Sequence, residues 1–306
     1  MKKANLFLFF GYIYDKINIY YKSLGSGTDF MTEFIEKTLK GAGIELFAPI
    51  SLEKCILTRK YKLERCGFSD ISSLSAIMIA VPYLVKHERR NISAYAVPKD
   101  YHGFFKELFG RVIPVLEREY SDHRFVGFAD DSPIDERSAA AMAGLGIVGD
   151  NGMLITEKYS SYVFLGEIIT DLPIESVAGE IRRCEGCGKC KLACPTEKIG
   201  QCLSALTQKK GALSPEEQQI ILSHGYAWGC DICQEVCPHT KRAIADGTIY
   251  TNIEYFKNDN LPLLTLADID SMTDLEFASR AYSWRGRETV KRNLELFESK
   301  DSQNQT

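Results

Sequence analysis

The sequence lacks the bulk properties that would assign the protein to a membrane or to a nucleic acid. No apolar run approaches the roughly 18 residues that a membrane-crossing helix requires, although 45% of the residues are hydrophobic. The net charge of −4 creates no global positive field, so any contact with nucleic acid must come from a local basic patch. Internal repetition is limited to the cysteine pattern. These absences favour an ordinary soluble globular protein.

A clear secretion signal is also missing. The apolar stretch Leu6–Phe10 has no small-residue cleavage site after it, and the charged residue Asp15 follows soon. Further along, Met31 precedes Thr32, a residue suited to cap a helix. We therefore expect residues 1–31 to be an amino-terminal extension.

Cysteine, by contrast, is abundant, and eight of the ten cysteines form two spaced groups. The first group has the spacing C-x2-C-x2-C-x3-C-P, the second has C-x2-C-x3-C-P, and one further cysteine lies between them. Each [4Fe–4S] cluster needs four thiolates, and in two-cluster ferredoxins the fourth cysteine of a run ligates the other cluster. The spacing therefore predicts two [4Fe–4S] clusters. The expected ligands are Cys184, Cys187, Cys190 and Cys237 for one cluster, and Cys194, Cys202, Cys230 and Cys233 for the other.

Zinc and disulfides are the alternatives for such cysteines. A structural zinc site uses four ligands and does not require two Cys-x3-Cys-Pro endings. Disulfides are disfavoured because closely spaced Cys-x2-Cys groups in a chain of enzyme size are typical of metal or redox sites. Cluster thiolates need a reducing compartment, so we expect a cytoplasmic protein. The two remaining cysteines, Cys55 and Cys66, are expected to be packed or spare thiols.

The region before the cysteines has the pattern of an α/β domain. Residues 75–82 form a continuous apolar run, which is typical of a strand buried on both faces. Further strands are expected at 125–128, and at 153–155 paired with 163–165 around a polar turn. Helices are expected over residues 32–40, over 104–120 with a kink or break at Pro114, and over 136–142.

These patterns divide the chain into four parts. We expect an extension over residues 1–31, an α/β domain over 32–175, a ferredoxin-like double-cluster domain over 176–245 and a C-terminal segment over 246–306. The last segment contains a charged amphipathic stretch, 285–298, and then polar residues 299–306 that are expected to be disordered.

Three segments of the α/β domain contain candidate ligand-binding residues. Asp100–His102 groups three ionisable side chains before a helix, although a capping aspartate and a packed tyrosine are the more common explanation. Residues 128–133, with Glu136 and Arg137 after them, are rich in ordinary turn formers. Gly144–Gly152 allows close backbone approach to a ligand, but its position after a helix does not support dinucleotide binding.

In their order along the chain, these segments resemble one family, the cobalamin-dependent epoxyqueuosine reductases of tRNA modification. The resemblance covers most of the chain, from about Thr32 to about Leu296. Its motifs are Tyr95-Ala96-x3-Asp100-Tyr101-His102, Phe128-x-Asp130-x2-Pro133-x2-Glu136-Arg137, Ala143-Gly144-Leu145-Gly146 through Asn151, Phe164-Leu165-Gly166-Glu167, Thr170-Asp171-Leu172, Cys202-Leu203-Ser204, Gly229-Cys230-Asp231-x-Cys233-Gln234-x2-Cys237-Pro238 and Gly286-Arg287-x4-Arg292-Asn293. No single motif is decisive, but the ordered set is very specific.

The resemblance implies a cobalamin-binding α/β domain similar to nitroreductase-like and reductive dehalogenase folds. Two [4Fe–4S] clusters would pass electrons to the cobalt. The substrate would be the epoxide of epoxyqueuosine at the wobble position of tRNA, reduced to the cyclopentene of queuosine with loss of water. Asp130 stands at the position of the family's proton donor. Epoxide opening produces an alkoxide that a positioned carboxylic acid can neutralise, and burial against an apolar corrin face would favour the neutral acid.

The resemblance also implies which residues contact cobalamin. The expected contacts are Arg65, Ala94, Asp130, Asn151, Leu154, Ser204 and Asp231. Two substitutions depart from the family pattern beside the glycine-rich segment. Ile147 replaces a usual tryptophan, and Asp150 replaces a usual lysine, which reverses a charge near the expected cofactor or substrate.

The expected partners are tRNA, bound at its anticodon loop, and an external electron donor such as a flavodoxin or ferredoxin. Longer family members continue into a helical-repeat domain that helps to grip tRNA, whereas this chain stops soon after Asn293. A modest basic strip remains for phosphate contacts, although such a charge run is more often a solvated face. Its members are Lys209, Lys210, Arg285, Arg287, Lys291 and Arg292. We expect a monomer with no membrane contact.

Two other functions use the same cysteine pattern. A reductase of another small electrophile, similar to a reductive dehalogenase, would keep the redox centres and change the substrate. An electron carrier or corrinoid-activating protein would keep the clusters without needing Asp130 as a proton donor. The Asp130→Asn variant separates these classes, because only a reductase should lose turnover.

Overall fold

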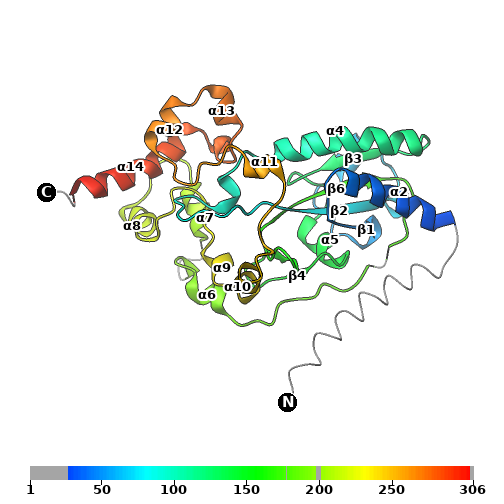
Figure 1. Cartoon of the computed structure of the whole chain (residues 1–306), viewed down its shortest axis with the longest axis horizontal. Helices are drawn as coiled ribbons and strands as arrows, with labels where there is room; N and C mark the ends of the chain where they lie inside the picture. Colours follow the sequence, from blue (N-terminus) through cyan, green and yellow to red (C-terminus); the bar gives the residue numbers. More distant parts are fainter. Residues whose placement is uncertain (1–26, 177, 198–200, 304–306) are drawn as a thin grey trace, which may run out of the picture.

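The computed structural model describes residues 27–176, 178–197 and 201–303, so most of the expected extension lies outside the described residues. Its centre is a four-stranded antiparallel sheet with strand order β1-β2-β6-β3 (Figure 1). The strands are β1 (Leu46–Ser51), β2 (Ser75–Pro82), β6 (Val163–Thr170) and β3 (Phe125–Phe128). The α/β class is confirmed, and β3 forms one edge of the sheet.

Strand β2 shows why both faces of the sheet are covered. All of its residues are buried. Ile77 and Ile79 belong to one apolar core, and Ala76 and Met78 belong to the other, as the two-residue period of a strand requires. The helices that cover the two faces are α2 (Gly27–Gly41) and α4 (Tyr101–Glu119) on the first, and α5 (Glu136–Met142) on the second (Figure 1).

Helix α4 is continuous, so the expected break at Pro114 does not occur. The helix begins after Asp100, whose side chain accepts a hydrogen bond of 2.8 Å from the backbone N–H of His102. Buried side chains on both sides of the proline, Leu108 and Leu116, pack against the sheet. This packing keeps the helix together where the proline removes one backbone hydrogen bond.

The expected pairing of residues 153–155 with 163–165 is wrong. The two-residue strand β5 (Leu154–Ile155) pairs instead with β4 (Ile147–Val148) in a separate two-stranded sheet. Residues 163–165 begin the long strand β6, which lies between β2 and β3. Because almost all of β6 is buried, it belongs in the centre of the larger sheet, where both of its faces are covered.

The ends of the two terminal helices also differ from expectation. Helix α2 begins at Gly27, so Thr32 lies inside the helix and does not cap it. Helix α14 (Arg287–Gln303) continues beyond residue 298, where disorder was expected to begin. The expected disorder of 304–306 concerns residues outside the described range.

The cysteine-bearing segment leaves the sheet after β6, and the chain later returns to it. Ile249 and Phe256 are fully buried in the same core as α4, and the backbone N–H of Thr251 donates to the carbonyl of Leu84 at 2.9 Å. The remaining helices are α3 (Tyr61–Arg65), α6 (Lys189–Ala193), α7 (Leu203–Thr207), α8 (Pro215–His224), α9 (Ile232–Glu235), α10 (Pro238–Ala245), α11 (Glu254–Lys257), α12 (Leu266–Ser271) and α13 (Asp274–Ala278). Three-residue 3-10 turns occur at η1 (Leu52–Lys54), η2 (Ile71–Ser73), η3 (Ala94–Ala96) and η5 (Ser283–Arg285).

The C-terminal part has a core of its own. The rings of Trp228 and Tyr282 are both fully buried there, with centroids 6.2 Å apart. Two of its short helices, α12 and α13, begin at threonine capping boxes, Thr265 with Asp268 and Thr273 with Glu276. Among the described helices, none combines the length and apolar character needed to cross a bilayer.

Candidate active site and cluster-binding segment

Asp130 occupies a strained turn directly after edge strand β3. Its φ of 63° is left-handed, a conformation that costs energy for a residue other than glycine but that aspartate tolerates better than most. Its backbone N–H donates to Oε1 of Glu136 at 3.1 Å, and its carbonyl accepts from the N–H of Ser132 at 2.8 Å. The turn is therefore held from the side of α5.

The segment just before α3 and α3 itself hold the outer side of the same turn. Lys62 forms an ion pair with Asp131 and also donates to the Asp131 carbonyl at 2.8 Å. Thr58 and Arg59 donate to the Ser132 carbonyl at 3.2 and 3.3 Å. Asp130 itself is not buried, because 70% of its side chain is exposed. The described protein atoms alone do not provide the burial expected for this acid.

His102 is the ionisable group beside Asp130. Its Nε2 lies 3.9 Å from Oδ2 of Asp130, and its Nδ1 lies 2.6 Å from Oδ1 of Asp100. The hydrogen bond to Asp100 raises the pKa of His102, and the charge of Asp130 raises it further. The protonated imidazole is thus favoured next to the Asp130 carboxylate. The first residues of α4 and the end of β3 together place an acid and a base side by side.

A buried pair of carboxyl groups lies beneath the turn. Glu167 of β6 is fully buried, and Ser132 donates from its hydroxyl to Oε1 of Glu167. The side chains of Glu136 and Glu167 also hydrogen-bond to each other. Burial raises the pKa of Glu136 to about 7 and raises that of Glu167 well above its usual value. Glu136 raises the pKa of Glu167 further, whereas the interaction with Glu167 lowers the pKa of Glu136.

The sequence prediction gave Glu167 no function of its own. Its signal was nevertheless present, since it is the one ionisable residue in the apolar run 163–170. An acid at such a position is either paired or kept neutral.

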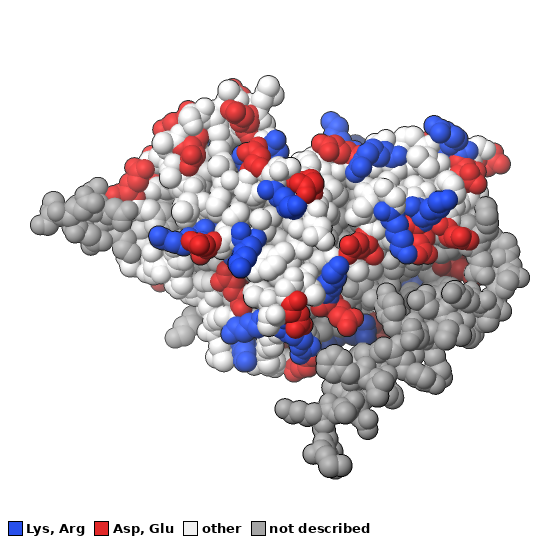
Figure 2. All heavy atoms as spheres, viewed as in Figure 1, with Lys and Arg blue, Asp and Glu red and all other residues white. Residues whose placement is uncertain are grey.

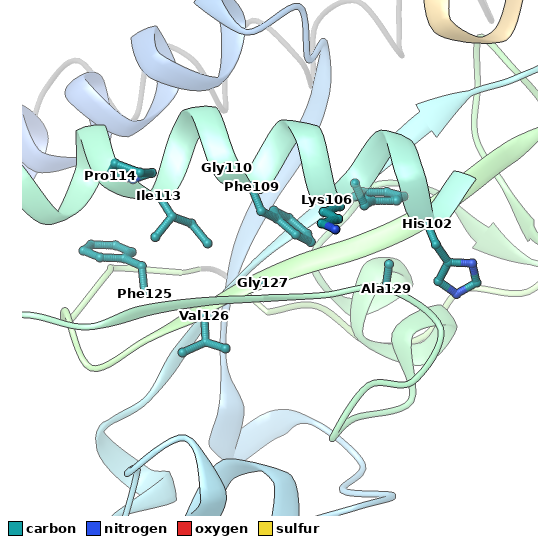
Figure 3. A pocket seen from close by; sticks show the side chains of 11 residues that line it. His102, Lys106, Phe109, Gly110, Ile113, Pro114, Phe125, Val126, Gly127 and Ala129 are labelled. Carbon is teal, nitrogen blue, oxygen red and sulfur yellow. The ribbon is translucent and has the colours of Figure 1, made fainter. Parts of the chain in front are cut away.

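A cavity of about 560 Å³ extends from this turn along α4 and β3. Figure 3 shows His102 and Ala129 at one end, Phe109 and Lys106 in the middle, and Phe125 toward the other end. The walls are mainly apolar and aromatic, and the ionisable side chains among them are His102 at one end and Lys106 in the middle. This arrangement suits a ligand that places its reactive group beside Asp130.

The described cysteines of the two predicted cluster sites lie on short helices and turns. Helix α6 packs against α9, which brings the first cysteine run to the second. Cys184 lies near enough to Cys190 for its charge to raise the pKa of the Cys190 thiol. Cys202 and Cys233 act on the thiol of Cys230 in the same way. These neighbours fall within the two predicted ligand sets, although Cys190 also lies near Cys233 of the other set.

The chemistry of these thiols fits iron–sulfur clusters. Burial raises the pKa of Cys230 to about 12 and that of Cys233 to about 11, so a positive centre is needed to hold them as thiolates. Within the described residues, no three His, Cys, Asp or Glu side chains converge closely enough to hold one metal ion.

The glycine-rich turn after β4 connects the α/β domain to the cysteines. The backbone N–H of Asp150 lies 3.4 Å from the sulfur of Cys184. The side chain of Asn151 hydrogen-bonds to the thiol of Cys233 and lowers its pKa, against the larger effect of burial. Asn151, predicted as a cofactor contact, is thus placed directly beside the second cysteine group.

Two other predicted contacts, Ala94 and Asp231, meet in a buried network. The Asp231 carboxylate is fully buried and accepts from the Ala94 N–H at 2.6 Å, from Ser93 Oγ at 2.5 Å and from Arg90 at 2.6 Å. Gln234 donates to it as well, at 3.1 Å. This network joins the segment before α4 to the segment that contains Cys230 and Cys233.

The remaining predicted contacts lie apart from that network. Arg65 is exposed at the end of α3, with its guanidinium 5.3 Å from the centre of the Tyr61 ring. Leu154 is buried in β5, and the hydroxyl of Ser204 accepts from Gln208 at 3.0 Å. Their contact with a cofactor stays a prediction.

Most of the expected basic strip is already engaged within the protein. Lys209 pairs with Glu217, and Lys291 pairs with Asp270 at 2.8 Å. Arg287 and Arg292 donate mainly to backbone carbonyls. Figure 2 shows basic and acidic side chains interspersed on the visible face and no large basic area. A phosphate-binding strip formed by all six residues would have to break these contacts.

Comparison with known proteins identifies the cysteine segment first. Residues 183–240 match the family model of the 4Fe-4S double cluster binding domain. The chain is 30% identical over 247 residues to an epoxyqueuosine reductase of Lactococcus garvieae, covering 75% of this chain and 69% of the relative. It is 33% identical to one from Synechocystis, covering 65% of this chain and 73% of the relative. It is 34% identical to the epoxyqueuosine reductase of Bacillus subtilis, covering 73% of this chain and 62% of the relative.

Solved structures give the same result for the fold. A crystal structure of selenomethionine-labelled epoxyqueuosine reductase has a TM-score of 0.70 at 25% identity, and covers 89% of this chain and 82% of that one. A structure of epoxyqueuosine reductase with an epoxyqueuosine-modified tRNA-Tyr stem loop has a TM-score of 0.68 at 25% identity, and covers 89% and 81%. Against the curated relatives, the chain spans 61% of the length of the Gloeobacter violaceus protein and 73% of the Synechocystis one.

Proposed function

This chain belongs to the epoxyqueuosine reductase family, and on that premise we propose that it reduces epoxyqueuosine in tRNA to queuosine. The observation that carries the proposal is the position of Asp130. Its carboxyl group is exposed in a turn held by α3 and α5 and lies 3.9 Å from His102, which lines the cavity, while the glycine-rich turn contacts both cysteine groups. This arrangement supports Asp130 as the proton donor beside an electron-carrying segment.

The proposed role of Asp130 follows from the chemistry of the reaction. Opening the epoxide places negative charge on the departing oxygen, and a carboxylic acid within reach stabilises that charge by giving up its proton. His102 lies 3.9 Å away and is itself favoured in the protonated form. We assign to His102 the return of a proton to Asp130 between turnovers. Burial of Asp130 would come from the bound cofactor and substrate, since the described protein atoms leave it exposed.

Cobalamin, when bound, supplies low-valent cobalt as the electron source for the substrate. The residues present fit such a group in part. Arg65, Asn151 and Ser204 keep polar atoms that are at least partly exposed and could hold its amide side chains. The Ala94 N–H donates its hydrogen bond to the Asp231 carboxylate, so neither group is free to bind the cofactor. We therefore assign Asp231 to the support of the site, and to Ala94 an apolar contact at most. Leu154 offers only apolar contact.

We further propose a cytoplasmic monomer that takes electrons from a flavodoxin or ferredoxin and passes them through the two clusters. A reducing compartment keeps the cysteine thiolates intact. The tRNA would be recognised at the anticodon loop, where a single-stranded base can be turned out and presented to a cavity.

The first experiment is nucleoside mass spectrometry of tRNA. The chain would be expressed with cobalamin in a bacterium that lacks its own epoxyqueuosine reductase. We expect epoxyqueuosine to be converted to queuosine. Persistent epoxyqueuosine, despite purified protein that contains both clusters and binds cobalamin, would contradict the proposal and favour another electrophile as substrate.

The second experiment replaces the proton donor. We expect Asp130→Asn to lower turnover by roughly a hundredfold or more, because an amide cannot donate the proton. Cluster content and cobalamin binding should not change. Asp122→Asn, which alters an exposed carboxyl outside the turn, is the matched control and should behave as the unmodified chain. Full turnover by the Asp130 variant would favour an electron carrier or another donor.

A further inference from the structure

Glu167 is a buried acid without a cation. It lies in central strand β6 and is 0% exposed. Its Oε1 accepts from Ser132, but its Oε2 is buried and receives no donor among the described residues. No described lysine or arginine forms an ion pair with Glu167 or with Glu136. An ionised carboxylate in such surroundings would retain a large desolvation cost, so a neutral acid is favoured.

The neighbour of Glu167 is another carboxyl group, that of Glu136. Two carboxylates can only accept hydrogen bonds, so contact between them is stabilising only when one of them carries a proton. The two carboxyl groups lie within hydrogen-bonding reach of each other, and burial favours the protonated form of each. Two close carboxyl groups that share one proton lose it as a pair, at a higher pH than either would alone.

The other groups that face the pair do not remove this need for a proton. The charges of Asp130 and Asp135 act on Glu136, and Glu167 faces the partly buried thiol of Cys55. From α4, Tyr101 and His102 face Glu136. His102 alone among these five can become a cation, and it already hydrogen-bonds to Asp100.

Both ends of the Asp130 turn are attached to this pair. The backbone N–H of Asp130 donates to Glu136 at 3.1 Å, and the Ser132 hydroxyl donates to Glu167. The left-handed conformation of Asp130, with φ of 63°, requires such support from its surroundings. We propose that the proton shared by Glu136 and Glu167 holds the Asp130 turn in place, which makes the pair a protonation-dependent positioning device for the acid of the active site.

The consequence of losing that proton follows from charge and burial. Two negative charges would then lie together in the sheet, and Glu136, the less buried of the two, would turn away toward water. Its departure would free the Asp130 N–H and release the turn. In a solved epoxyqueuosine reductase from Bacillus subtilis, the catalytic loop is swung out of the active site, so this loop has a second position in that protein.

The test measures the turn directly, without tRNA. Hydrogen–deuterium exchange of peptides that cover residues 126–134 is followed in the cluster-containing protein and corrected for the intrinsic rate at each pH. Between about pH 6 and about pH 8.5 we expect protection of the turn to fall about tenfold. In Glu167→Gln the amide donates permanently to Glu136, so protection should change less than about twofold over the same range.

Further variants separate a protonation effect from a purely structural one. Glu136→Gln should also keep the turn protected at high pH, and it serves if Glu167→Gln fails to fold. Glu136→Ala should lose protection at every pH, because the acceptor for the Asp130 N–H is gone. Glu53→Gln, an exposed acid in η1, should behave as the unmodified chain. Equal protection of the unmodified chain at both pH values, or an unchanged pH response in both glutamine variants, would overturn the inference.

The role given to Asp130 rests on the proposed function, but the exchange measurement does not. A turn that responds to pH in a protein that fails to convert epoxyqueuosine would leave the positioning device standing and overturn the proposed function. If turnover is present, its loss at alkaline pH should move to higher pH in Glu167→Gln. A merely structural role for Glu167 would lower turnover at every pH and leave the profile unmoved.

Discussion

The two most deeply buried acids among the described residues are stabilised in different ways. Asp231 accepts from the Arg90 guanidinium, the Ser93 hydroxyl and the backbone N–H of Ala94. Glu167 has only Ser132 and another acid beside it. A buried charge must be paired or neutralised, and these two residues show both solutions within one molecule. The neutralised acid makes the stability of the protein depend on pH.

The direction of that pH dependence follows from the raised pKa values. Between about pH 4.5 and about pH 7, the folded protein binds more protons at Glu136 and Glu167 than the unfolded chain does. The free energy of unfolding should therefore be largest at low pH and fall as pH rises through this range, by roughly 1–3 kcal/mol from this pair. Anaerobic urea unfolding at several pH values measures the effect.

Glu167→Gln should reduce that decline, because the amide cannot lose a proton, and Glu53→Gln should leave it unchanged. If both variants lose stability with pH in the same way as the unmodified chain, the pair is not the origin of the decline.

At the scale of single residues, the sequence alone predicted part of the candidate site. The cysteine spacing is local, so the sequence alone was sufficient to predict the double-cluster segment, which the family match confirms. The roles of Asp130 and of the cobalamin contacts came from the resemblance and stay predictions. The contact of Glu136 with Glu167 joins a helix to a strand about 30 residues later, and no local pattern encodes such a meeting.

At the scale of elements, the close packing of α4 on the sheet depends on glycines in the strands, which have no side chain. A Cβ added at Gly166 of β6 would lie 2.5 Å from the ring of Phe105, a residue that is only 1% exposed. Gly127 of β3 has the same relation to Phe109, at 2.4 Å. Glycine in these strands therefore allows the aromatic face of α4 to approach the backbone of the sheet.

The matched pair of variants Gly166→Ala and Gly110→Ala tests this packing. Gly166→Ala should lower the free energy of unfolding by roughly 1–3 kcal/mol, because the buried ring must move. Gly110 lies inside α4 with nothing within 4 Å of an added Cβ, so Gly110→Ala should raise stability by about 0.4–1 kcal/mol. Chemical unfolding of both variants measures the difference. Equal destabilisation by the two would refute the packing argument.

Elements with a strong local pattern were predicted, and their long-range pairing was not. The apolar run of β2 and the alanine-rich α5 have the bounds expected from the sequence. Residues 153–155 and 163–165 were expected to pair because only a short polar turn separates them. In the structure the burial of the whole of β6 decides its partners, and those partners, β2 and β3, lie far from it in the chain.

At the scale of the whole molecule, charge limits how the protein can hold tRNA. The net charge is −4, and most members of the basic strip are paired or bound to carbonyls. Lys210 differs from them, because it forms no ion pair with the described residues. We infer that few cations are available for phosphates, and that binding gains little from counterion release.

The salt dependence of tRNA binding measures this, and the prediction rests on the proposed function. Lys210→Gln should reduce the slope of log Kd against log salt concentration by about 0.7, the value for one phosphate contact on a single strand. Lys291→Gln should change the slope little, because Asp270 already neutralises that ammonium at 2.8 Å. An equal effect of both substitutions would show that the ion pair opens when tRNA binds.

The return of the chain to the sheet after the cysteine segment sets an order of events during synthesis. The ring of Phe256 packs against Phe104 and Phe164, so the first core is incomplete until that residue has left the ribosome. All eight cysteines of the cluster segment are translated earlier. They therefore leave the ribosome before Phe256 completes this core, and we expect iron and sulfide to reach them most easily while the core is still open.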